Sequence, residues 1–145
     1  MSIIDTLITD RTAQDVALGT AKGHYNATDL NRVGEATRYI ADRLNGYGYA
    51  VSVTGRSDWT VTDIPRQGDM DTYLGDIRAL REAIAVMEST PEVPARIGAS
   101  APGAKDGVNW ARANDIEKIL EDLDLLINNM AAAWFYCGEI FCGEV

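Results

Sequence analysis

Apolar residues recur at alternating steps of three and four along one stretch of the chain near its C-terminal end. The positions are Ala113, Ile116, Leu120, Leu123, Ile127, Met130 and Trp134. Because such steps return to one face of an α-helix, they predict a single amphipathic helix over residues 111–136, roughly 39 Å long at about 1.5 Å per residue. The charged residues of this stretch fall off the apolar stripe and are expected on the solvent face: Glu117, Lys118, Glu121, Asp122 and Asp124.

Two earlier segments show the same spacing. One has its apolar face at Leu30, Val33, Thr37, Ile40, Leu44 and Tyr47, and the other at Met70, Tyr73, Ile77, Leu80, Ile84 and Met87. The first pattern predicts a helix over residues 28–46, whose first turn Thr28 or Asp29 can cap. The second predicts a helix over residues 69–88 with Asp69 as its cap.

A shorter helix is expected near the N-terminus. Thr9 or Asp10 can accept a hydrogen bond from its first turn, and the helix carries Val16. Gly19 and Gly23 have low helix propensity and are expected to end it. This helix therefore belongs to an arm that precedes the main helical region.

Three segments lack a helical pattern. Tyr49, Val51 and Val53 alternate with small or polar residues, which predicts a short strand or an extended segment with no evident pairing partner. Residues 89–107 are rich in proline and glycine and are expected to form a loop between helices. The residues from Gly138 onward are too rich in glycine for a helix and are expected to be extended.

Together these elements predict an all-α fold, a small bundle of three main helices plus a short N-terminal helix, with extended N- and C-terminal segments. Residues 1–24 are expected to form an N-terminal arm with the short helix. Residues 25–137 form the helical bundle domain, and residues 138–145 an extended C-terminal tail. Both terminal segments carry apolar residues outside the bundle, which indicates that contacts with partners contribute to stability.

The charge of the chain argues against two classes of partner. Lys and Arg number 13 against 22 Asp and Glu, which gives a formal net charge of −9. Phosphate backbones and anionic membrane surfaces attract basic proteins, so neither nucleic acid nor a membrane is an expected partner. The chain also lacks a run of about 20 apolar residues and a leader pattern, which predicts a cytoplasmic protein. Its two cysteines, Cys137 and Cys142, are expected to be free thiols.

No motif predicts catalysis, a metal site or a cofactor. His24 is the only histidine and lies in a segment flanked by glycine, without a serine or cysteine in a nucleophile signature. Two cysteines and one distant histidine do not supply a zinc site. Paired carboxylates such as Asp122 and Asp124 point in different directions on a helix, so we expect them to be solvated.

Aromatic and apolar residues are concentrated at the C-terminal end. They are Trp134, Phe135, Tyr136, Ile140, Phe141 and Val145. Consecutive helical positions differ by about 100°, so Trp134, Phe135 and Tyr136 cannot all face one core. Either these six residues form a partner-binding patch, or Trp134 belongs to the core while Phe135 and Tyr136 pack under the tail.

Several short motifs follow one another along nearly the whole chain. They are Asp10-Arg11-Thr12, Tyr25-Asn26-Ala27-Thr28-Asp29-Leu30-Asn31-Arg32-Val33, Leu44-Asn45-Gly46-Tyr47-Gly48-Tyr49, Asp58-Trp59-Thr60, Asp63-Ile64-Pro65 and Asn114-Asp115-Ile116-Glu117-Lys118. With the closing Gly-Glu-Ile-Phe-x-Gly-Glu pattern at 138–144, this series resembles a group of phage and prophage tail-associated proteins of Gram-positive bacteria.

The resemblance implies a structural protein of the virion, in the tail, baseplate or fibre region, with no catalytic activity. Such a protein is assembled in the cytoplasm of the host bacterium and binds other virion proteins and copies of itself. An alternative from another class is a small acidic regulator or inhibitor that binds a host or phage enzyme. Gene neighbourhood discriminates between them, because tail and lysis genes accompany the first and early genes the second.

Overall fold

The computed structural model describes residues 2–19, 27–60, 62–63, 66–84, 89–94 and 110–140, with backbone alone at Trp110 and at residues 133–140. These residues form one short 3-10 helix and four α-helices. They are η1 (Ile3–Thr6), α1 (Ala13–Leu18), α2 (Ala27–Gly46), α3 (Gln67–Ala83) and α4 (Trp110–Ile140). No strand occurs in this part of the chain. The predicted all-α fold, with three main helices and a short N-terminal one, is confirmed.

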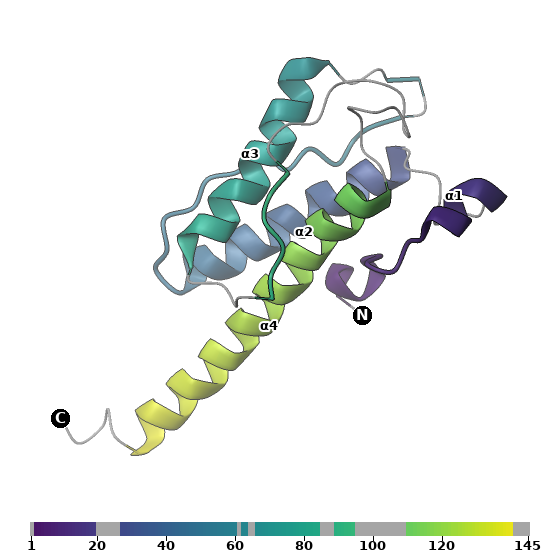
Figure 1. The fold of residues 1–145 in the computed structure, drawn as a ribbon. Coiled ribbons are helices and arrows are strands. Elements are labelled where there is room, and N and C mark those ends of the chain that lie inside the picture. The colour runs from purple at the N-terminus through teal and green to yellow at the C-terminus, as the bar shows by residue number, and fades with distance from the viewer. Residues whose placement is uncertain are drawn as a thin grey trace.

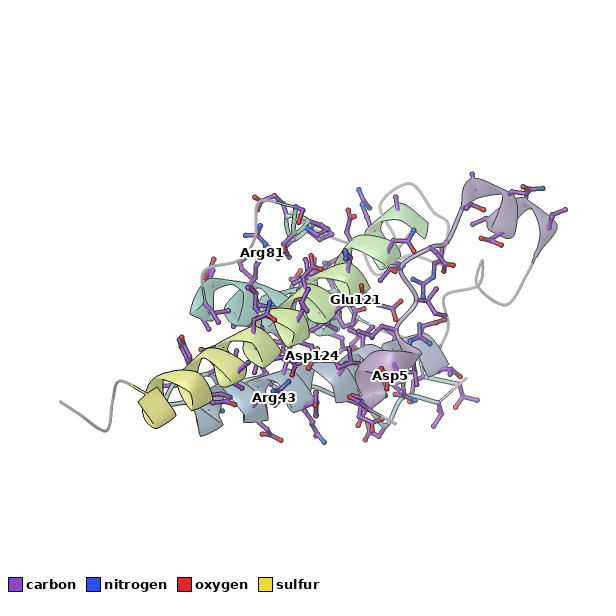
Figure 2. All side chains as sticks on the ribbon, turned by 90° about the horizontal axis from the view of Figure 1, so that it is seen from below. Asp5, Arg43, Arg81, Glu121 and Asp124 are labelled. Carbon is purple, nitrogen blue, oxygen red and sulfur yellow. The ribbon has the colours of Figure 1, made fainter. Side chains whose placement is uncertain are left out.

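The three main helices pack on one another and run in the same direction (Figure 1). On α2 and α4, Arg32 pairs with Glu117 and, further along both helices, Arg43 pairs with Asp124 (Figure 2). Helices joined by short loops lie antiparallel, so parallel neighbours need connections that return along the bundle. Between α2 and α3, residues 47–60 make this return.

The core lies where the apolar faces of α2, α3 and α4 meet, and the predicted stripes supply most of it. Buried stripe residues are Leu30, Val33, Thr37, Ile40, Leu44, Met70, Ile77, Leu80, Ala113, Ile116, Leu120, Leu123 and Ile127. Ile4 of η1 is also buried in this core. The first turn of the N-terminal arm is therefore packed against the bundle, although the sequence indicated apolar residues lying outside it.

Several helix boundaries differ from the predicted ones. α2 begins at Ala27, so Thr28 and Asp29 lie inside its first turn and do not cap it from outside. The cap of α1 is Thr12, whose hydroxyl accepts from Asp15 N–H while the Asp15 carboxylate accepts from Thr12 N–H; neither Thr9 nor Asp10 caps this helix. This reciprocal arrangement satisfies two backbone donors at once, so it fixes the start of the helix.

α3 begins at Gln67 with Arg66 in the cap position, so the prediction that Asp69 is the cap is wrong and Asp69 lies in the first turn. The helix ends at Ala83 rather than at 88, because the backbone of Ile84 is extended.

α4 is longer than predicted, since it continues to Ile140 and includes Gly138 and Glu139. The prediction that the extended tail begins at residue 138 is therefore wrong for residues 138–140, while residues 141–145 lie outside the described chain. Extending an existing helix adds a hydrogen bond per residue without a new nucleation step. A single glycine costs only about 1 kcal/mol relative to alanine, which a long helix tolerates.

After α2 the chain makes a turn at Tyr47 and Gly48 and then returns along that helix in an extended conformation. We call residues 47–60 the return segment. The side-chain amide of Asn45 donates to Val51 C=O and accepts from Val51 N–H, both at 2.8 Å. Asn31 does the same for Trp59, at 2.8 and 2.7 Å. Side-chain amides thus take the place of a neighbouring strand, which explains why an alternating pattern occurs here without a sheet.

Candidate functional site

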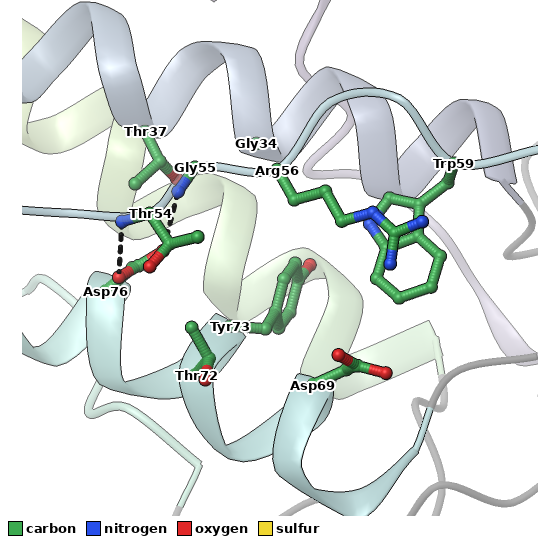
Figure 3. A pocket seen from close by; sticks show the side chains of 10 residues that line it. All are labelled: Gly34, Thr37, Thr54, Gly55, Arg56, Trp59, Asp69, Thr72, Tyr73 and Asp76. Atoms are coloured by element: carbon green, nitrogen blue, oxygen red, sulfur yellow. Dashed lines mark hydrogen bonds between the residues drawn. The ribbon is translucent and has the colours of Figure 1, made fainter.

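A cavity of about 220 Å³ lies between α2, α3 and the return segment (Figure 3). It is lined by Gly34 and Thr37 of α2, by Thr54, Gly55, Arg56 and Trp59 of the return segment, and by Asp69, Thr72, Tyr73 and Asp76 of α3. The lining combines two aromatic rings with charged and hydroxyl groups. Such a cavity can bind a small polar or charged group.

Two glycines and one carboxylate position the return segment over this cavity. A Cβ on Gly34 would lie 1.9 Å from the carbonyl oxygen of Arg56, so only glycine lets the two backbones approach this closely. Gly55 has a φ of 55°, a left-handed conformation that favours glycine. The Asp76 carboxylate accepts from the N–H groups of Thr54 and Gly55, at 3.1 and 2.9 Å.

One wall of the cavity is a stack of Arg56 on Trp59. The guanidinium carbon of Arg56 lies 3.6 Å from the centre of the indole ring, which is a cation–π contact. Arg56 also pairs with Asp58 at 2.7 Å and with Asp63 at 3.4 Å. The hydrogen bond between Arg56 and Asp58 raises the pKa of Arg56 and lowers the pKa of Asp58, so both groups stay charged at neutral pH.

The opposite wall is formed by the first turns of α3. Asp69 and Tyr73 lie one turn apart on this helix, and both side chains line the cavity (Figure 3). One Asp69 oxygen accepts from the backbone N–H of Arg66, the residue at the cap position, at 2.8 Å. The cavity therefore has a carboxylate and a phenol on the wall that faces the Arg56 stack.

A second polar cluster is buried where the N-terminal arm meets α2 and α4. Arg11 pairs with Glu117 at 2.5 Å and with Asp29 at 3.4 Å, and Arg32 reaches the same two carboxylates at 2.7 and 2.5 Å. Arg11, Asp29 and Glu117 are 3%, 6% and 0% exposed. Two cations and two anions thus neutralise one another away from water.

Further hydrogen bonds fix the backbone of the arm to this cluster. The Asn114 side chain accepts from Arg11 N–H at 3.0 Å and donates to Arg11 C=O at 2.8 Å. The Glu117 carboxylate accepts from Ile8 N–H at 3.2 Å. Burial by itself lowers the pKa of Arg32, but hydrogen bonds and the charges of Glu117 and Asp29 outweigh burial and raise it.

Two charged residues of α4 correct an expectation from the sequence. Glu117 and Asp122 were expected on the solvent face of the third helix, but both are buried. Asp122 accepts from Thr90 Oγ1 at 2.9 Å and lies 2.8 Å from Lys118 Nζ. At both Glu117 and Asp122, a segment distant in the sequence covers the charged side chain. Helical periodicity cannot predict such a long-range contact.

The predicted partner-binding residues lie at the far end of α4 from this cluster. Trp134, Phe135, Tyr136 and Ile140 occupy consecutive turns of the helix in a stretch described as backbone alone. Phe141 and Val145 lie outside the described residues. The structure therefore places four of these six residues on one continuous helix, where the sequence predicted a helix followed by an extended tail.

Among the described residues that line the cavity there is no histidine or cysteine. His24 and Cys142 lie outside the described residues, and Cys137 lies in the backbone-only stretch of α4. No group of three or more potential metal ligands occurs in residues 2–132 where side chains are described. None of the described helices is both long enough and apolar enough to cross a membrane.

No family model, curated protein or solved structure matches this chain.

Proposed function

We propose that this protein is a non-enzymatic structural component of a phage or prophage virion, in the tail, baseplate or fibre region, and acts through contacts with other virion proteins. The proposal starts from the ordered motifs that resemble such proteins. Several residues of those motifs have a defined role in the fold. Arg11 and Glu117 attach the arm, while Asn31, Asn45 and Trp59 hold the return segment. Chains that share these motifs would thus share the architecture.

The observation that carries the proposal is the continuation of α4 past the other helices (Figure 1). Among the side chains that the structure describes, its last fully buried residue is Ile127, and the partly buried Met130 still contacts the Tyr49 hydroxyl at 3.7 Å. Residues 131–140 add roughly 15 Å of helix at about 1.5 Å per residue. This extension contains the sequence Trp-Phe-Tyr, and helices with aromatic and apolar residues commonly bind in a groove on another protein.

The opposite end of the molecule carries a second element that stands off the core (Figures 1 and 2). None of the six residues of α1 is buried, and Val16 and Leu18 are 43% and 69% exposed. A helix this short is marginal in water unless other contacts support it. An exposed apolar helix at one end and a helix that continues past the bundle at the other support a subunit that bridges neighbours in an assembly.

The direct test is mass spectrometry of purified virions or tail-like particles from the strain that carries this gene. The chain should be present at several copies in each particle. If particles contain every other tail protein but lack this one, the proposal is wrong. A chain that is found only in the cell, bound to a host or phage enzyme, would support the regulator or inhibitor class instead.

A truncation locates the assembly contact. A chain that ends at Ala133 lacks Trp134, Phe135 and Tyr136 but keeps every buried stripe residue of α4, so it should fold and yet be missing from particles. Leu125→Ala is the matched control, because Leu125 is an apolar residue of the same helix, 48% exposed, within the packed part. We expect that variant to assemble normally.

A further inference from the structure

We propose that the cavity between α2, α3 and the return segment receives a lysine or arginine side chain from a neighbouring protein. This inference rests on the proposed function, because it names the chemistry that a virion partner would present to this face. The cavity is separate from the end of α4, and its residues belong to none of the contacts predicted from the sequence. Its charge, its aromatic walls and its volume favour a basic side chain.

Charge is the first argument. Asp69 and Asp76 line the cavity, and Asp58 and Asp63 lie at its edge, where they pair with Arg56. Carboxylates therefore outnumber the one lining guanidinium, and the whole chain carries a net charge of −9. Such a field attracts a cation and repels an anion.

Asp69 is the carboxylate best placed to meet the cation. Both oxygens of Asp76 already accept from backbone N–H groups of the return segment. Asp69 uses one oxygen, Oδ2, for Arg66 N–H and makes no other hydrogen bond within the described part of the chain. Its second oxygen is thus left for a donor in the cavity, and a charged donor gives the stronger bond.

The aromatic walls are the second argument. Arg56 lies 3.6 Å above the indole of Trp59, so one wall of this site already binds a guanidinium through a ring. The ring of Tyr73 lies across the cavity next to Asp69 (Figure 3). A ring face beside a carboxylate is a favourable environment for an ammonium or guanidinium group.

Volume is the third argument. The cavity measures about 220 Å³, below the 300–1,000 Å³ or so of typical small-molecule sites. At about 30 Å³ for each water it holds roughly seven waters. One long side chain that displaces a few waters fits this space, whereas a nucleotide or a large cofactor does not.

The test uses the full chain, labelled with ¹⁵N, and a pair of small probes followed by NMR. The active probe is Nα-acetyl-lysine amide, and the control is the same molecule with its side-chain amine acetylated and therefore neutral. The charged probe should shift the Trp59 indole and Gly55 amide signals saturably, in the millimolar range. The neutral probe should leave these signals unchanged. Equal shifts with both probes, or no shift with the charged one up to tens of millimolar, would overturn the proposal.

Two aspartates of α3 give a matched pair of variants. Asp69→Asn removes the carboxylate that faces the cavity but keeps a side chain that can cap the helix, so it should weaken probe binding about three- to tenfold. Asp71→Asn removes the same charge from an exposed position outside the cavity and should leave binding unchanged. Equal weakening in both variants would mean that net charge, and not this cavity, attracts the probe.

A third variant fills the space. Thr72→Trp places a large ring at the exposed rim, so it should abolish the shifts while the melting temperature stays close to that of the unmodified chain. Continued binding in a folded Thr72→Trp protein contradicts the proposal. Because these measurements use the isolated protein, they succeed or fail independently of whether the chain is found in particles.

Discussion

The two halves of α4 carry the same apolar periodicity, but among the side chains that the structure describes the stripe is fully buried only as far as Ile127. From Ala113 to Ile127 every stripe residue is buried, whereas Met130 is only partly buried and the helix then continues past the bundle. The difference arises from the lengths of the neighbours, because α2 ends at Gly46 and α3 at Ala83. A stripe thus indicates which face of a helix can be buried, and the neighbouring helices decide how much of it is.

The first half of α4 also teaches that its polar positions are not equivalent. Glu117 and Asp122 are buried like the apolar residues beside them, while Glu121 between them is only partly buried. Distant segments account for this difference. The N-terminal arm brings Arg11 to Glu117, and the stretch after α3 brings Thr90 to Asp122.

The largest expected effect comes from removing the buried charge in the first half of α4. Glu117→Ala removes the fully buried carboxylate that pairs with both Arg11 and Arg32, which should cost about 3–5 kcal/mol. Urea unfolding should show this loss, and the melting temperature should fall on the order of 10 °C. Released from the cluster, Arg11 should also become accessible to trypsin, which cleaves after arginine.

The control for that experiment is Glu121→Ala, one helical turn further along. Glu121 is partly exposed and pairs with Lys118 at 3.3 Å, so its removal should change the free energy of unfolding by less than about 1 kcal/mol. If the two variants melt at the same temperature, the buried cluster is not what attaches the arm.

The next effect compares two leucines on the same turns. Leu123→Ala removes a fully buried side chain and should cost about 2–5 kcal/mol, since it leaves a cavity in the core. Leu125→Ala, at a position 48% exposed, should cost less than about 0.5 kcal/mol. Thermal melts of the two variants measure the contrast directly, and the reverse order would show that the helix is rotated relative to the bundle.

The smallest effect is expected in the second half of the helix. A chain that ends at Ala133 keeps its core, so its helical circular dichroism per residue and its melting temperature should stay close to those of the full chain. A fall of more than about 2 kcal/mol in the free energy of unfolding would mean that residues 134–145 fold back over their own subunit. That outcome would favour the core-and-tail alternative for Trp134, Phe135 and Tyr136.

The helices were largely predictable because they depend on local rules. Spacing along one face located α2 and most of α4, and the alternation from Tyr49 to Val53 correctly indicated an extended segment without a pairing partner. The cap of α1 was missed although its signal was present, since Thr12 and Asp15 have the spacing of a capping box. Residues 138–140 were predicted to be extended because of their glycine content. That prediction did not take into account that they follow directly on a long helix, which can continue through them.

The cavity and the buried cluster could not have been predicted in this way. The cavity forms because Gly34 contacts the backbone of Arg56 and because Asp76 accepts a hydrogen bond from the backbone of Gly55. The residues in each contact are about 20 positions apart, and no periodic pattern in the sequence predicts such pairs. Arg11 and Glu117 are more than a hundred positions apart, yet each is buried because the other neutralises it. Whether a charged residue is solvated depends on a partner that local pattern does not reveal.

By itself the sequence determined that this protein is helical, approximately where its three main helices lie and which faces are apolar, because helix formation and amphipathicity follow from neighbours three and four positions apart. Only the tertiary structure decided that the three main helices run parallel, that Arg11 and Glu117 belong to the interior, and that a cavity opens beneath the return segment. These features depend on how segments far apart in the chain pack together. Burial, charge neutralisation and cavity shape arise only when those segments are in contact.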